Sequence, residues 1–212
     1  MYLTETVAKD KIVRYAKSIF ERGLTFGASA NMSVRIDKAW VITPTNTCFG
    51  FLEAEELSVV DLDGRLLRGA PASKEFKLHR AMYAERPGDT CIIHLHSTYA
   101  TALSCLPATD PGNAVPTYTP YLTMRLGPIA TVPYFAPGDD QLAEAVGQVA
   151  AKHPGVIMAN HGPIVSAPTV EACVYGMEEL EESCKIALML AGRPANTLSE
   201  VQVQDLLDRF RK

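Results

Sequence analysis

The chain has 212 residues, of which 47% are hydrophobic, and it carries a formal net charge of −4. This size and composition predict one globular domain over 1–212, because such a chain can bury a substantial core. The composition excludes a disordered chain and, without a Lys/Arg run, a nucleic-acid-binding protein. The sequence has no apolar stretch long enough to cross a bilayer, so we expect no membrane association.

The first third of the chain predicts one helix followed by short strands. Apolar residues recur at helical spacing over 5–22. Alternation of apolar and polar residues then predicts strands over 32–36 and 40–42, joined by a short turn. A second hairpin is predicted from 59–62 through an Asp-Gly turn to 65–67.

The middle of the chain predicts a helix over 75–85 and then a buried strand over 91–93. Residues 98–106 fit a short helix. The segment 107–120 holds four prolines, and we expect it to be an ordered loop over a site. A further strand is predicted over 129–132.

The last third predicts a helix over 139–152, a strand over 156–158, a long helix over 169–191 and a weaker helix over 199–210. The short strands connect mostly through hairpins, and the helices lie outside that run. This arrangement favours a layered α/β domain with a largely antiparallel sheet over a doubly wound parallel one. The chain has no Gly-x-Gly-x-x-Gly sequence and no Walker-type loop, which disfavours the nucleotide enzymes that use them.

The cysteines are odd in number and widely spaced, which is typical of reduced thiols in a cytoplasmic protein. This pattern argues against a disulfide framework and against a zinc site made of thiolates. The five cysteines are Cys48, Cys91, Cys105, Cys173 and Cys184.

Three of the five histidines stand at the ends of apolar strands. His94 and His96 are two residues apart, which places both side chains on one face of a strand, and His161 precedes a glycine after another strand. Three imidazoles with an open position form a catalytic metal site. Each group alone also fits hydrogen-bonded structural histidines, but together they favour metal. For His79 and His153 we expect structural or solvent roles.

A second group of polar residues precedes the helix at 75–85. Ser73 suits the N-cap position, with Lys74 and Glu75 in the first turn, and ordinary capping explains these residues by itself. The functional interpretation is that Ser73, Lys74 and the free N–H groups receive a phosphate while Glu75 faces the metal. Asn31 and the segment 43–47 supply further small polar groups of kinds that are also common in turns.

Taken together, these segments resemble the class II aldolase/adducin family. The resemblance runs from the first helix to the end of the long helix near Ala191, and the order and spacing of the segments are more specific than any one of them. The family implies a three-layer α/β/α fold with a central mainly antiparallel sheet. Many members are homotetramers with sites between subunits. The matching segments are 30–33, 42–46, 73–75, 94–96 and 160–162.

The resemblance also implies roles for individual residues. Its metal ligands are His94, His96 and His161, and Glu75 is the acid–base residue that also touches the metal. Tyr121 matches a tyrosine that donates a proton across a subunit boundary, so the proton donor is either Glu75 or Tyr121. The phosphate pocket is implied to consist of Asn31, Thr45, Asn46, Ser73 and Lys74.

Three positions depart from the sugar-phosphate aldolases of the family. Ala30 and Asn46 stand where those enzymes usually have glycine, and Lys74 stands where they usually have serine. The segments around Asn46, Lys74 and Tyr121 look most like 3-oxo-tetronate 4-phosphate decarboxylases, a bacterial branch of the family that acts in four-carbon sugar-acid catabolism. We therefore expect a small phosphorylated sugar acid as substrate, with dihydroxyacetone phosphate and CO₂ as products. The expected cation is Zn²⁺, with Mn²⁺ or Co²⁺ as alternatives.

Two other functions remain open at this point. The same scaffold supports a fuculose-phosphate type aldolase or a pentose-phosphate 4-epimerase, because an aldolase reaches the same enediolate by breaking a different carbon–carbon bond. A non-catalytic binding module of the adducin kind belongs to a different class. Retention of the three histidines and Glu75 argues against that module.

Overall fold

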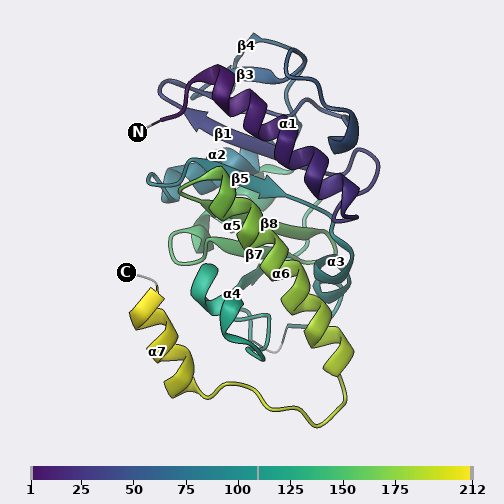
Figure 1. The fold of residues 1–212 in the computed structure, drawn as a ribbon, viewed down its shortest axis with the longest axis vertical. Helices are drawn as coiled ribbons and strands as arrows, with labels where there is room; N and C mark the ends of the chain where they lie inside the picture. Colours follow the sequence, from purple (N-terminus) through teal and green to yellow (C-terminus); the bar gives the residue numbers. More distant parts are fainter. Residues whose placement is uncertain (1, 109, 211–212) are drawn as a thin grey trace.

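The computed structural model describes residues 2–108 and 110–210. Thr109, inside the loop expected at 107–120, lies outside the described residues. Within them, eight strands form one sheet in the order β4-β3-β2-β1-β5-β8-β7-β6 (Figure 1). The strands are β1 (Asn31–Ile36), β2 (Ala39–Ile42), β3 (Ser58–Asp61), β4 (Leu66–Arg68), β5 (Cys91–His94), β6 (Ala130–Val132), β7 (Gly155–Met158) and β8 (Gly162–Ala167).

Helices cover both faces of this sheet. In Figure 1, α1 (Glu5–Glu21) and α6 (Val170–Leu190) cross in front of it, while α2 (Phe76–Glu85) and α5 (Asp140–Ala150) lie behind it. Each layer of helices encloses its own apolar core against the sheet. Across the described strands, β6 and β7 form the one parallel pair and every other pair is antiparallel. The three-layer, mainly antiparallel fold is therefore confirmed.

The remaining helices pack against the longer helices or against each other. The 3₁₀ helix η1 (Phe49–Phe51) contacts α1, and α3 (Thr98–Ser104) packs on α6. The last helix, α7 (Glu200–Phe210), follows an extended connection and lies beside α4 (Pro120–Arg125), as Figure 1 shows. In the part of the chain that is described, we find no helix long and apolar enough to span a membrane.

Two sequence expectations need correction. The loop expected through residue 120 ends one residue earlier, because Pro120 takes the first position of α4, where its missing N–H costs nothing. Strand β8 is not predicted, since Gly162 and Pro163 at its start disfavour a strand and leave only a short apolar run at Ile164 and Val165. Pro163 is tolerated because it lies one residue into β8, where its carbonyl still accepts the Leu95 N–H at 3.2 Å.

The alternation along two central strands prepares the site. In β1 and β5 the odd and even residues face opposite helix layers, so Met32 and Ile93 enter the core beneath α1 and α6. The register pairs Asn31 with His94 directly across the strands. Asn31, Ser33 and His94 therefore face α2, the helix that begins beside Glu75.

Candidate active site

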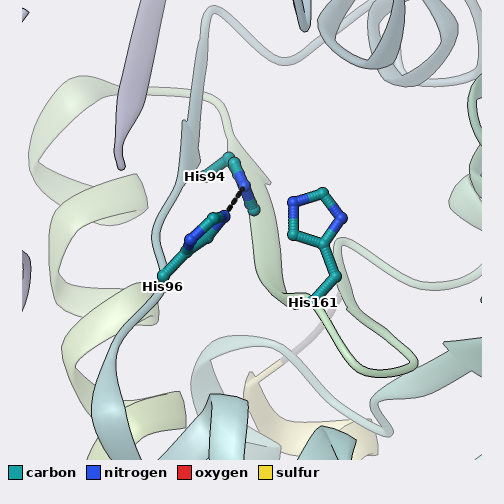
Figure 2. A group of neighbouring side chains, drawn as sticks. All are labelled: His94, His96 and His161. Carbon is teal, nitrogen blue, oxygen red and sulfur yellow. Dashed lines mark hydrogen bonds between the residues drawn. The ribbon is translucent and has the colours of Figure 1, made fainter. Parts of the chain in front are cut away.

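The three histidines expected as metal ligands lie together at the end of the sheet. His94 is the last residue of β5, His96 follows it by two residues, and His161 lies in the turn between β7 and β8. Figure 2 shows the three rings around a common space, and each pair of ring centroids is 4.9 Å apart. One ligand nitrogen from each ring lies within 4.8 Å of the others, so the cluster can hold a metal ion.

The local backbone explains why His161 reaches the cluster. Asn160 has φ 52°, a left-handed conformation that asparagine tolerates better than most residues. At Gly162 a Cβ atom would lie 2.5 Å from the carbonyl oxygen of Leu95. Only glycine allows the turn to approach β5 this closely, and that approach brings His161 beside His94.

A backbone carbonyl fixes the tautomer of His94. Its Nδ1 lies 2.8 Å from the carbonyl oxygen of Pro163, which can only accept a hydrogen bond. The ring therefore carries its proton on Nδ1, and the lone pair on Nε2 points toward His96, whose Nε2 is 3.1 Å away. Burial lowers the pKa of His94, and burial followed by the other two histidines lowers the pKa of His96 to about 4. Neutral imidazoles of this kind are suited to bind a cation.

His161 supplies the test of whether this set of side chains fits a metal. Both of its ring nitrogens are buried, and neither has a hydrogen-bond partner among the residues that the structure describes. In a tetrahedral zinc site with Zn–N bonds of about 2.0–2.1 Å, two ligand nitrogens are roughly 3.3 Å apart. The 3.1 Å between His94 Nε2 and His96 Nε2 is close to that spacing. The donor set therefore fits a divalent cation.

Glu75 adds a carboxylate to the histidine cluster. Its Oε2 lies 3.4 Å from His94 Nε2, and its Oε1 lies 3.3 Å from His161 Nε2. Asn31 Nδ2 donates to Oε2 at 2.6 Å. Burial alone would raise the pKa of this carboxyl, but His94, His161 and the Asn31 amide outweigh it and hold the pKa below its ordinary value. Glu75 is therefore ionised near neutral pH.

The start of α2 differs from the expected capping arrangement. The helix begins at Phe76, and Glu75 rather than Ser73 occupies the N-cap position, without a capping bond from its side chain. Ser73 still accepts the N–H of Glu75 on its hydroxyl at 3.3 Å. The Glu75 carboxylate is consequently free to turn toward the histidines instead of capping its own helix.

A cleft of about 200 Å³ opens beside the cluster. It contains every residue expected in the phosphate pocket, and these come from three separate segments of the chain. Lys74 is exposed at this cleft and forms no ion pair with any described residue. Asn46 has φ 57°, so it keeps the backbone conformation for which glycine is usually used. The expected residues that line the cleft are Asn31, Thr45, Asn46, Ser73, Lys74 and Glu75, with His96 and His161.

Tyr121 is not brought to this cleft. It lies in the first turn of α4, is 58% exposed, and does not line the cleft within the described chain. The other two histidines make local hydrogen bonds: His153 Nδ1 lies 3.0 Å from the Pro128 carbonyl, and His79 is buried between Ser33 and Asn31. Sequence reasoning did not find Pro137 and Gly138, which also line the cleft and carry no recognisable signal.

Comparisons with known proteins give one consistent result. The family described as Class II Aldolase and Adducin N-terminal domain matches residues 10–188. A 3-oxo-tetronate 4-phosphate decarboxylase of Haemophilus influenzae is 41% identical over 98% of this chain and 99% of its own. An L-fuculose phosphate aldolase of Methanococcus vannielii is 30% identical over 83% of this chain and 93% of its own. The crystal structure of YgbL from Klebsiella pneumoniae superposes with a TM-score of 0.93 at 39% identity, covering 96% of this chain and 99% of that one.

Proposed function

Because the chain belongs to the class II aldolase and adducin family, we propose that it decarboxylates 3-oxo-tetronate 4-phosphate to dihydroxyacetone phosphate and CO₂. The observation that carries this proposal is the near full-length similarity to decarboxylases of that name, at 41% identity in the Haemophilus influenzae protein. The aldolase relative is less similar and covers less of the chain. The reaction class is a carbon–carbon lyase in both cases.

The proposed metal ligands are His94, His96 and His161, with Glu75 as a fourth group that touches the metal in the free enzyme. His161 supports this assignment, because both of its ring nitrogens are buried without a hydrogen bond to any described residue and its Nε2 lies 3.3 Å from Glu75 Oε1. A divalent cation bound there supplies Lewis acidity that stabilises negative charge developing on substrate oxygens. Three imidazoles and a carboxylate suit Zn²⁺, so we propose zinc, with Mn²⁺ or Co²⁺ able to substitute.

The cleft orients the substrate in this proposal. Lys74, with no competing ion pair among the described residues, faces the dianionic phosphate, and Ser73 and Thr45 add neutral polar contacts. Asn31 and Asn46 complete the pocket. Holding the phosphate at one end places C1 to C3 near the histidine cluster, and such positioning lowers the entropic part of the barrier.

The chain's own acid–base groups complete the reaction. When C1 leaves as CO₂, its bonding electrons pass to C2 and are delocalised with the C3 carbonyl as an enediolate. Protonation of C2 then gives dihydroxyacetone phosphate. Glu75 is ionised here and suits proton acceptance and relay, whereas the Tyr121 phenol suits proton donation. Since Tyr121 lies exposed and outside the cleft of its own chain, we propose that it serves a neighbouring subunit of a homotetramer.

The cysteines support the cellular setting that we propose. All five are free thiols, and Cys91, Cys173 and Cys184 are buried. Unpaired cysteines in this number are typical of a reducing compartment, which supports a cytoplasmic enzyme.

One assay separates the proposed reaction from its alternatives. Purified protein supplied with Zn²⁺ or Mn²⁺ is incubated with both C2 epimers of 3-oxo-tetronate 4-phosphate. Release of CO₂ and dihydroxyacetone phosphate in equal amounts is the expected result. Aldehyde-dependent condensation of dihydroxyacetone phosphate without CO₂ release would instead identify an aldolase. Absence of stoichiometric divalent metal and of any turnover would identify a non-catalytic binding module.

A further inference from the structure

A buried line of hydrogen bonds runs from Glu75 away from the cleft. Asn31 Nδ2 donates to Glu75, and Asn31 Oδ1 lies 2.5 Å from His79 Nε2. On the other side of the ring, His79 Nδ1 lies 2.7 Å from Ser33 Oγ, which is 3.0 Å from the Tyr83 hydroxyl. Asn31, His79, Ser33 and Tyr83 are all buried. Each of these polar groups therefore depends on its protein partner for a hydrogen bond.

One arrangement of protons satisfies this line from Glu75 to Ser33. Asn31 Nδ2 donates to Glu75 Oε2 at 2.6 Å, so the Asn31 amide turns its oxygen toward His79. An amide oxygen only accepts, so His79 carries its proton on Nε2. Burial, reinforced by His94, lowers the pKa of His79 to about 3, so the ring is neutral and its Nδ1 is an acceptor. The Ser33 hydroxyl must then donate to Nδ1. The Tyr83 hydroxyl has one proton for Ser33 Oγ at 3.0 Å, the Ser33 carbonyl at 3.2 Å or the Thr90 carbonyl at 3.3 Å.

We propose that His79 is a positioning residue that fixes the Asn31 amide and, through it, the Glu75 carboxylate. This inference rests on the proposed role of Glu75 in the lyase reaction. Glu75 and His79 are four residues apart at the start of α2 and share one face of it, whereas Asn31 belongs to β1. The line therefore joins the helix that carries the carboxylate to the strand that is paired with His94.

The decisive atom is the Nε2 proton of His79. If that proton is lost, nothing holds the Asn31 oxygen away from Glu75, and the amide can turn its oxygen toward the carboxylate. Two acceptors would then face each other and displace Glu75 from the histidine cluster. A histidine kept only for packing would need the volume of the ring but no donor at this atom, which makes the two roles separable.

The tautomer is the first measurement, because it requires no substitution and no substrate. In ¹⁵N spectra of histidine-labelled, metal-loaded protein near pH 7, the His79 signals are assigned by their absence from a His79→Gln variant. We expect a neutral ring protonated at Nε2. A ring protonated at Nδ1 would overturn the proposal whatever reaction the enzyme catalyses.

Two variants then test the donor. In His79→Gln the amide nitrogen takes the place of Nε2 and can still donate to Asn31, whereas in His79→Asn the shorter side chain reaches only the Ser33 side. We expect His79→Asn to lose roughly 10- to 100-fold in kcat at saturating metal, as is typical when a group that orients an active-site side chain is removed. His79→Gln should retain about tenfold more kcat than His79→Asn. KM should rise by less than kcat falls in His79→Asn, since Asn31 is one of five proposed pocket residues and Lys74 and Thr45 are untouched.

His153 provides the matched control, because its ring lies against the Pro128 carbonyl and outside the cleft. The same Gln and Asn substitutions there should give equal kcat. Rates are read on whichever lyase reaction the unaltered protein catalyses, so failure of the decarboxylase assignment does not remove this test. Equal losses in His79→Gln and His79→Asn would contradict a donor role, as would a loss confined to melting temperature.

Discussion

Two glutamates, buried Glu181 and half-buried Glu75, flank the segment that carries His94 and His96, and they differ in how completely they are hydrogen-bonded. Glu181 comes from α6 and accepts from Ser97 Oγ at 2.7 Å and from the backbone N–H groups of Tyr99 and Ala100 at 2.8 Å. These donors belong to the first turn of α3, where a carboxylate also interacts favourably with the helix dipole. Both oxygens of Glu181 therefore accept hydrogen bonds from within the protein, three in all among the described residues.

Glu75, on the opposite layer of helices, accepts one strong hydrogen bond, from Asn31. Its remaining lone pairs face His94 and His161 at 3.3–3.4 Å, at the edge of an open cleft. A buried carboxylate that accepts hydrogen bonds on both oxygens stabilises the fold, whereas one with spare acceptor sites beside a cleft can bind a cation or take a proton. The difference in hydrogen bonding thus separates a structural glutamate from the proposed catalytic one.

The largest expected effect comes from removing the charge of Glu75 while keeping its shape. Glu75→Gln should lower kcat by roughly 10²- to 10⁴-fold, the range for loss of a general acid–base group. Its melting temperature should stay close to that of the unaltered protein, because an amide can still accept from Asn31. Steady-state kinetics at saturating metal, together with metal analysis, measures this. A variant with unchanged kcat would contradict the assigned role.

The line of hydrogen bonds behind Glu75 predicts a dependence of stability on pH. His79 is neutral in the fold, with a pKa of about 3, but takes up a proton near pH 6.5 when unfolded. The unfolded state therefore binds more protons between these values, and stability falls as the pH is lowered from 6.5 toward 3. Between pH 7 and pH 4 this group accounts for about 3 kcal/mol.

Urea unfolding of metal-free protein at a series of pH values measures this loss, and His79→Gln should show a flatter profile by about that amount. His94 and His96 also titrate in the metal-free protein, but both the unaltered protein and His79→Gln contain them. The difference between the two stability profiles therefore reports His79. Parallel profiles for the two proteins would contradict the assigned burial of a neutral ring.

The same comparison predicts a stability effect on the other side of the cluster. Glu181→Gln turns an amide NH₂ toward donors of α3, so at least one buried N–H or O–H group loses its acceptor. Unfolding free energy should fall by roughly 2 kcal/mol. Chemical denaturation measures this loss. If Glu181→Gln instead lowered kcat as much as Glu75→Gln does, without any loss of stability, the two glutamates would not differ in role.

The sequence predicts the features of the fold and site that depend on the spacing of residues along a single strand or helix. The spacing of two between His94 and His96 at the end of an apolar strand predicts their shared direction. A layered, largely antiparallel α/β domain follows from the hairpins and amphipathic helices, whereas the three-layer arrangement is implied by the family resemblance. Strand β8 escaped prediction because local propensity at Pro163 opposes it, and only pairing with β5 and β7 stabilises it. In that case tertiary context outweighed intrinsic preference.

The contacts that separate the two glutamates were not predictable from one sequence. Glu181 lies 84 residues from Ser97, and His79 lies 46 residues from Ser33. No local pattern encodes a hydrogen bond over such a separation, so Glu181 was not singled out. His79 was expected to have a structural or solvent role, and the structure adds the partners of each ring nitrogen.

The smallest expected effect concerns the residue beside Glu75. Lys74→Met should raise KM for a phosphorylated substrate about tenfold, equivalent to about 1.4 kcal/mol, because an exposed lysine–phosphate contact is partly screened by solvent. Lys77→Met is the matched control: it removes the same charge from the same part of the chain, but Lys77 is paired with Asp140 at 2.5 Å and lies outside the cleft. Its KM should be unchanged. Equal KM changes in both variants would mean that substrate binding depends only on the overall charge around the start of α2. A change confined to Lys74→Met would place the substrate phosphate beside Lys74, next to the Glu75 carboxylate.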